Sequence, residues 1–255
     1  MKIGVCCTAD IAETVKSLGY DYIEENLSRI ASMSDKDFEI LSEKYRAVGI
    51  PVYSTNCFFP GNLNIYSNES SEEVAAYVEK AMKRANALDV KVCVLGSGKV
   101  RSIPEGEDPN VIKYKFSALV AKIGRVAAKY GISIAIEALR YQETNLGNTV
   151  RDVTELAEKS GEENVGALVD FFHFFCNEEK DDGLLCAGKK LIHTHIARPN
   201  LDRRMPTEED LPMVKKWAQM LKDIDYSGHI SLEGSFDCNS LAETRPVMEV
   251  FRNVN

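Results

Sequence analysis

Eight short runs of apolar and β-branched residues, separated by longer stretches with helical periodicity, constrain the fold of this chain more than any other feature. The expected strands are 2–6, 20–24, 51–55, 90–95, 133–137, 165–170, 191–196 and 229–233. The expected helices are 11–18, 35–48, 71–88, 109–130, 149–159, 178–186, 208–223 and 240–251. Strands that alternate with helices form parallel βαβ units, and eight such units in about 250 residues suit a closed barrel. We therefore predict a (β/α)8 TIM barrel in which residues 1–255 form a single domain.

An open, doubly wound α/β sheet would share this alternation of strands and helices. Such a sheet commonly carries a G-x-G-x-x-G turn after its first strand, and the residues that follow strand 2–6 contain no such turn. Polar side chains instead collect at the carboxyl ends of the late strands, where barrels place their active sites. These two observations favour the closed barrel.

Composition and charge narrow the classes of function. Acidic residues outnumber basic ones by 39 to 31, which gives a net charge of −8. This balance argues against nucleic acid as a partner, because nucleic-acid-binding proteins gain affinity from clustered basic residues. No apolar run approaches the roughly 20 residues of a membrane span, and the N-terminus lacks the pattern of a signal peptide. The seven cysteines are irregularly spaced and include no C-x-x-C pair, so we expect free thiols and a cytoplasmic location.

The last four predicted strands each carry, at their carboxyl end, a side chain that can bind a metal ion. These residues are Glu137, Asp170, His195 and Glu233. In a closed parallel sheet such strand ends meet at one rim, so the four side chains could share one ion. Three carboxylates and one imidazole form a mostly oxygen donor set, which favours Mn²⁺, with Mg²⁺ or Co²⁺ as alternatives, over Zn²⁺.

The other histidines of the late strands are expected to have supporting roles. His193 lies two residues before His195, so both side chains point to the same face of the strand. His195 is nearer the carboxyl end and is the expected ligand, whereas His193 is expected to pack inside the barrel or to support the ligand. His229 begins its strand at the far rim and is expected to be structural.

Longer motifs extend this pattern and resemble a known family. Residues 137–145 read E-A-L-R-Y-Q-E-T-N, 170–173 read D-F-F-H, 193–197 read H-T-H-I-A, 203–206 read R-R-M-P and 228–233 read G-H-I-S-L-E. Together these segments resemble the xylose isomerase-like barrels, and within them the ketose 3-epimerases and related sugar epimerases, whose corresponding motifs are E-x-L-N-R-x-E-T-N, D-x-x-H, H-x-H-I-A and R-R-x-P. The resemblance is strongest in the second half of the chain.

The resemblance implies an isomerase of carbohydrate metabolism that inverts carbon 3 of a ketose or ketose phosphate. In such an enzyme the four residues named above bind one divalent ion, which holds two adjacent sugar oxygens and stabilises an enediolate. Glu137 and Glu233 would lie on opposite faces of the substrate, where one removes a proton and the other returns it.

The same resemblance assigns residues to substrate binding and suggests an oligomer. Glu143, His173 and Arg203 would hydrogen-bond the sugar hydroxyls near the reacting carbons. The loop after His195 is two residues longer than in the epimerases, so Arg204 or Arg198 could take the role of Arg203. Relatives form homodimers or homotetramers, and we expect the same here.

Some features leave the substrate open. The Asn-Arg pair of the family's first motif is replaced by Arg140-Tyr141, and the first half of the chain matches only in its general strand pattern. An aldose–ketose or hydroxypyruvate isomerase and a 3-keto-glycoside lyase would use the same proton abstraction, so both remain alternatives.

Two other readings fit the sequence less well. A zinc-dependent abasic-site endonuclease shares the barrel but needs several histidines in its first half, and this chain has four histidines, none before His173. A non-catalytic sugar-binding barrel would be expected to lose a ligand or a catalytic carboxylate, and all of them are present.

Overall fold

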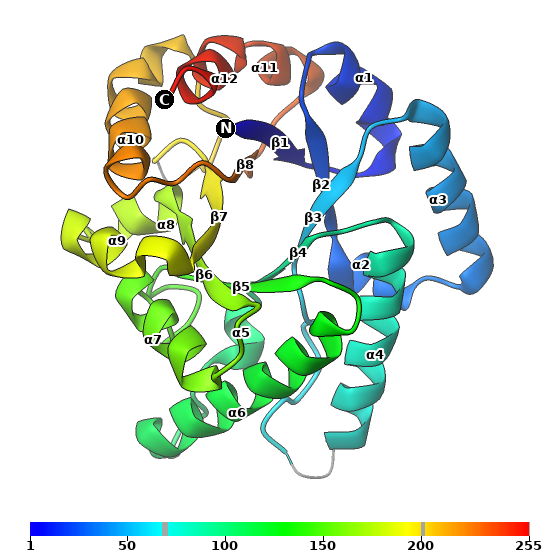
Figure 1. Ribbon diagram of the computed structural model, residues 1–255, viewed down its shortest axis with the longest axis vertical. Helices are drawn as coiled ribbons and strands as arrows, with labels where there is room; N and C mark the ends of the chain where they lie inside the picture. Colours follow the sequence, from blue (N-terminus) through cyan, green and yellow to red (C-terminus); the bar gives the residue numbers. More distant parts are fainter. Residues whose placement is uncertain (68–70, 200–201, 255) are drawn as a thin grey trace.

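Every strand of the sheet pairs in parallel with the next strand along the chain, and the last strand returns to the first. The computed structural model describes residues 1–67, 71–199 and 202–254 (Figure 1). Its strands are β1 (Lys2–Cys6), β2 (Tyr22–Asn26), β3 (Val52–Asn56), β4 (Val92–Leu95), β5 (Ser133–Glu137), β6 (Val165–Asp170), β7 (Leu191–Ile196) and β8 (His229–Leu232). β8 closes the ring on β1, with Lys2 opposite His229 and Ile3 opposite Ile230. The predicted eight-stranded TIM barrel is therefore confirmed.

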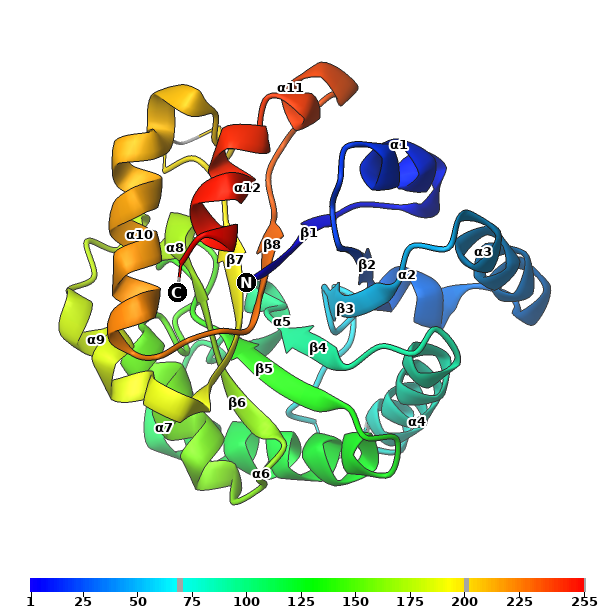
Figure 2. The same cartoon turned by 45° about the horizontal axis from the view of Figure 1, so that its top comes forward.

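Helices surround the barrel on its outside (Figures 1 and 2). They are α1 (Ala12–Ser17), α2 (Leu27–Ser32), α3 (Asp35–Val48), α4 (Ser71–Ala87), α5 (Gly98–Arg101), α6 (Pro109–Ala128), α7 (Val150–Ser160), α8 (Phe171–Cys176), α9 (Asp181–Ala187), α10 (Leu211–Asp223), α11 (Cys238–Ala242) and α12 (Arg245–Arg252). Figure 2 shows α10 and α12 side by side next to β7 and β8. No helix in the described part of the chain has the length and apolar character needed to cross a membrane.

Local sequence signals set several helix boundaries. Ser34 caps α3 by accepting a hydrogen bond from the backbone N–H of Asp37, and Gly49 ends that helix with φ of 67°. Thr149 and Asp152 form a capping box at the start of α7, which ends at Gly161 with φ of 74°. These contacts satisfy backbone groups that the helix itself leaves without partners.

The structure corrects several of the predicted boundaries. The second strand is 22–26 rather than 20–24, because Tyr20 belongs to the turn after α1 and bonds Thr244 through its hydroxyl. The predicted helix 178–186 lies at 181–187, and a separate short helix, α8, begins directly after β6. The predicted helix 240–251 is divided into α11 and α12, because Pro246 in the first turn of α12 has no backbone N–H to donate to the carbonyl of Ala242 at the end of α11.

The apolar residues fall into two layers that leave the carboxyl end of the barrel polar. The larger core lies between the strands and the surrounding helices. A smaller cluster of Val92, Val94, Ala135 and Leu168 fills part of the barrel interior. Because side chains alternate along a strand, the residues two positions after Ala135 and Leu168 also face inward. These residues are Glu137 and Asp170, so carboxylates lie at the rim, directly after the apolar cluster inside the barrel.

Candidate functional site

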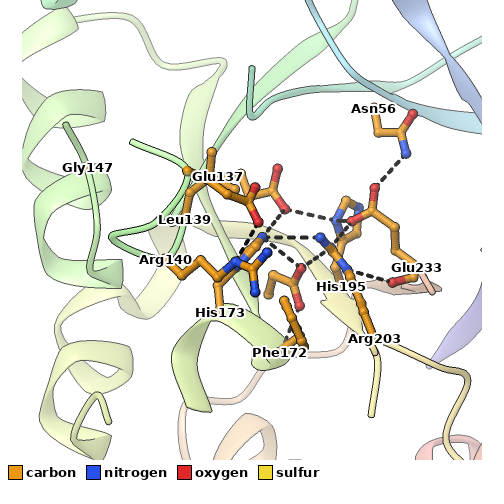
Figure 3. A network of polar contacts seen from close by, with 12 residues as sticks. Asn56, Glu137, Leu139, Arg140, Gly147, Phe172, His173, His195, Arg203 and Glu233 are labelled. Carbon is orange, nitrogen blue, oxygen red and sulfur yellow. Dashed lines mark hydrogen bonds and ion pairs between the residues drawn. The ribbon is translucent and has the colours of Figure 1, made fainter. Parts of the chain in front are cut away.

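Four side chains from neighbouring strands meet at the carboxyl end of the barrel (Figure 3). Glu137, Asp170, His195 and Glu233 each offer one donor atom, and these four atoms lie within 4.8 Å of one another. The Nδ1 atom of His195 lies 3.4 Å from Oε1 of Glu137 and 2.9 Å from Oε2 of Glu233. The strands thus bring together the residues that the sequence pattern predicts to share one ion.

The donor atoms at this centre fit a bound cation. Oε1 of Glu137 and Nδ1 of His195 are buried and have no hydrogen-bond partner among the described residues. Three buried or nearly buried carboxylates face one another here, and Arg203 is the cation that contacts two of them. Buried charges are stable when they are paired or bind a metal, so a divalent cation suits this excess of negative charge.

The surroundings of the centre shift the pKa values of Glu137 and Glu233 in opposite directions. Burial raises the pKa of Glu137 above its ordinary value. Burial acts in the same direction on Glu233, but the charges of His195 and Arg203 outweigh it and lower the pKa of Glu233. For His195, burial alone would lower the pKa, yet Glu24 and Glu233 raise it well above the usual range. A proton on His195 and a metal cation would be stabilised by the same negative surroundings.

Glu137 is held in place by its backbone and by a neighbouring glycine. The guanidinium of Arg101 is fully buried and donates to the backbone carbonyls of Leu95, Glu137 and Gly147, at 3.1, 2.7 and 3.1 Å. A Cβ atom at Gly96 would lie 2.2 Å from Oε2 of Glu137. Gly96 therefore leaves the space that the Glu137 carboxylate occupies.

Asp170 and Glu233 are each oriented by one hydrogen bond that leaves a second oxygen directed at the centre. Oδ1 of Asp170 accepts the backbone N–H of Phe172 at 2.8 Å, which also caps α8. Oε1 of Glu233 accepts from the side-chain amide of Asn56 at 2.7 Å. The remaining oxygens, Oδ2 of Asp170 and Oε2 of Glu233, both contact Arg203 at 2.5 Å.

Arg203 reaches the centre because the loop that follows β7 is hydrogen-bonded to the segment that follows β8. Its backbone has φ of 47°, in the left-handed region, and its carbonyl accepts the N–H of Ser235. A Cβ atom at Gly234 would lie 2.6 Å from that carbonyl oxygen, so the close approach requires glycine. The longer loop does not displace this arginine.

The two neighbouring arginines lie elsewhere. Arg198 pairs with Glu209 and Asp210, and Arg204 pairs with Asp202. Among the three candidate arginines of this loop, Arg203 is the one whose guanidinium contacts the centre.

The structure places His173 at the centre and Glu143 beside it. Nε2 of His173 lies 3.5 Å from Oδ2 of Asp170 and 3.9 Å from Oε1 of Glu137. Glu143 is about one-third exposed and accepts a hydrogen bond from Arg140 at 2.7 Å. The guanidinium groups of Arg140 and Arg203 both lie over the ring of Phe172. Glu143 is therefore connected to the centre through Arg140, this ring and Arg203.

Sequence reasoning missed three residues that support the site: Glu24, Asn56 and Arg101. Glu24 stands at the end of the predicted strand 20–24, and Asn56 follows the predicted strand 51–55 directly, so the signal that singles out the four rim residues also applies to them. Arg101 gives no such signal, because its partners are backbone carbonyls.

Comparison with known proteins places the chain in a family. Residues 12–254 match the family described as xylose isomerase-like TIM barrel. The chain belongs to this family. It is 24% identical over 193 residues to a protein named inosose isomerase from Bacillus velezensis, a match that covers 72% of this chain and 65% of that protein.

Solved structures share the fold over nearly the whole chain. The structure of D-psicose 3-epimerase with D-tagatose from Clostridium cellulolyticum H10 matches with a TM-score of 0.82 and 21% identity, and covers 100% of this chain and 99% of that one. A structure of IolI protein with a bound zinc atom matches with a TM-score of 0.78 and 20% identity, over 100% and 99% of the two chains. At these identities the structural likeness establishes the barrel.

Proposed function

We propose that this protein is a divalent-metal-dependent sugar isomerase that epimerises carbon 3 of a ketose. One observation carries the proposal: the carboxylates of Glu137 in β5 and of Glu233, directly after β8, flank Nδ1 of His195, with an Asp170 oxygen in the same small volume. Two bases that approach one point from different strands suit a reaction in which a proton leaves one face of a carbon and returns to the other. The family and the ketose 3-epimerase structures support the same class of reaction.

Glu137, Asp170, His195 and Glu233 would hold the ion. Mn²⁺ is the expected ion on the basis of the three carboxylates, with Mg²⁺ or Co²⁺ as alternatives, while the zinc atom in one related structure keeps Zn²⁺ among the ions to be tested. When bound, the ion would supply a positive charge that polarises the ketone of the sugar and makes the neighbouring C–H bond more acidic.

Side chains of the protein would transfer the proton and orient the sugar. Glu137 and Glu233 would exchange the proton on carbon 3, one as base and the other as acid. His173, Arg203 and Glu143 would orient the sugar through its hydroxyls, and Arg203 would also bring positive charge near the developing negative charge. The substrate is accordingly a small sugar or sugar phosphate, and a homodimer or homotetramer stays a prediction.

A second candidate is isomerisation, in which the proton returns to the adjacent carbon. The sequence relatives named inosose isomerase favour it, at 24% to 26% identity. Both reactions begin with removal of a proton beside a ketone, so the same four residues would serve either one. A lyase that acts on a 3-keto-glycoside begins in the same way.

Single substitutions of the two glutamates test the division of roles. We expect Glu137→Gln and Glu233→Gln each to lower turnover by about 10²-fold or more, because each removes a proton-transfer group. Glu158→Gln, an exposed position on α7, is the matched control and should leave turnover unchanged. Turnover is measured by NMR of the two epimers, with Mn²⁺ binding measured on each variant. Normal turnover in either glutamine variant at saturating Mn²⁺ would refute the proposed pair.

A further inference from the structure

The carboxylate of Glu24 forms a buried network behind His195. Its Oε1 atom lies 2.8 Å from Nε2 of His195, and its Oε2 atom lies 2.8 Å from Nε2 of His193. Oε2 also accepts from the hydroxyls of Ser54 at 2.6 Å and Ser231 at 2.5 Å. The five side chains come from β2, β3, β7 and β8 and are at most 1% exposed.

These contacts determine which nitrogen of His195 carries a proton. A carboxylate has no hydrogen to donate, so the hydrogen between Glu24 and His195 belongs to Nε2 of the imidazole. In the neutral ring, Nδ1 then carries a lone pair. That atom is the one 2.9 Å from Glu233 and 3.4 Å from Glu137, at the centre where the four donor atoms meet.

Glu24 differs from its neighbour Glu25 in what it contacts. Glu25 is equally buried, but it lies on the other face of β2, where it pairs with Arg29 and accepts from the hydroxyl of Tyr45 at 2.6 Å. Among the described residues, the hydrogen-bond partners of the Glu24 carboxylate are two imidazoles and two hydroxyls, and none of them is a lysine or an arginine. A buried carboxylate without a cationic side chain costs free energy, and a divalent ion on the far side of His195 would offset that cost.

We propose that Glu24 is a positioning residue, which holds His195 in the tautomer that directs its Nδ1 lone pair at the proposed metal centre and thereby sets metal affinity. The proposal rests on the proposed function, because it needs the centre to bind a divalent ion. Residues that orient a ligating histidine in this way typically change metal affinity by about 10- to 100-fold when they are removed. Ser54 and Ser231 fix the carboxylate itself, so its Oε1 atom remains directed at His195.

Substitution of Glu24 with a matched control tests this role. We expect Glu24→Gln to weaken Mn²⁺ binding by about 10- to 100-fold, measured by electron paramagnetic resonance titration, because an amide cannot accept from both histidines. Glu25→Gln removes an equally buried carboxylate and should leave Mn²⁺ affinity within about threefold of the wild type, whatever it does to thermal stability. Saturating Mn²⁺ should restore most of the turnover of Glu24→Gln, which a purely structural defect would not allow.

A measurement on the unaltered protein covers the case in which Glu24→Gln does not fold. In ¹⁵N-histidine-labelled protein loaded with Mg²⁺, long-range ¹H–¹⁵N correlation spectra should show the hydrogen of His195 on Nε2. A hydrogen on Nδ1 in the Mg²⁺-loaded protein, or wild-type Mn²⁺ affinity in Glu24→Gln, would overturn the proposal. Failure of the proposed function is distinguishable: the wild type would then bind Mn²⁺ tightly and depend on Glu24 for it, yet turn over no sugar.

Discussion

Gly96 offers the sharpest test of how the proposed centre is built. In Gly96→Ala, the added Cβ would lie 2.2 Å from Oε2 of Glu137, whereas ordinary contact begins at 3.4 Å. The carboxylate must therefore retreat by about 1.2 Å, because β4, which precedes Gly96, is paired with β5 and cannot easily yield. A displacement of about 1 Å at a reacting group can reduce rates by about 10²-fold.

We expect Gly96→Ala to lower kcat/KM by about 10²-fold and to weaken Mn²⁺ binding by about tenfold or more. Metal sites tolerate ligand distances only within about 0.2 Å of ideal, so a retreat of Glu137 affects binding as well as turnover. The free energy of unfolding should change by less than about 1 kcal/mol, because a flexible carboxylate end can move aside.

The assay combines isothermal titration with Mn²⁺ and initial rates on the sugar that the wild type turns over. Gly61→Ala is the control, since a Cβ at that exposed position meets no atom within 4 Å and its φ is not in the left-handed region. Wild-type metal affinity and turnover in Gly96→Ala would refute the role given to Glu137.

Two further predictions concern stability. Arg101→Met should lower the free energy of unfolding by about 3 kcal/mol or more, because it leaves three buried carbonyls without their donor. The measurement is urea unfolding, and Lys99→Met, at an exposed position on the same short helix, is the control. Burial raises the pKa of Glu179 from 4.5 to about 7, so its stabilising contribution is complete below pH 4.5 and is lost as the pH rises through 7, at a cost of at most about 3 kcal/mol. In urea unfolding at pH 5 and pH 8, Glu179→Gln should reduce the difference in the free energy of unfolding between the two pH values, whereas Glu178→Gln, at the exposed neighbouring position, should not. An unchanged difference in Glu179→Gln would contradict the role given to Glu179.

The fold and the ring of rim residues were accessible from sequence because both depend on periodicity. Alternating strands and helices predict the barrel, and side chains at equivalent strand ends must approach one another once the barrel closes. Glu137, Asp170 and His195 therefore needed only their position on a strand to be singled out. Glu233 follows β8 by one residue and still reaches the centre, so small errors in strand boundaries did not matter.

The supporting contacts were harder to predict because they join residues far apart in the chain. Glu24 meets His195 across 171 positions, and Asn56 meets Glu233 across 177. Their strand positions mark them as rim or interior residues, but which partner each contacts depends on the stagger of the closed sheet. No pattern in the sequence predicts that Arg101 is fully buried, because its burial follows from the turn after β4, which the sequence pattern does not specify.

Incorporation of solvent deuterium is the most direct test of proton transfer at carbon 3. The Mn²⁺-loaded protein is incubated in D₂O with a panel of ketoses and ketose phosphates, and the sugar carbons are followed by NMR. We expect deuterium at carbon 3 together with formation of the 3-epimer. Deuterium at carbon 1 or 2 with an aldose product would establish the isomerase instead. Tight Mn²⁺ binding with no exchange in any sugar of the panel would contradict proton transfer on a ketose at this centre.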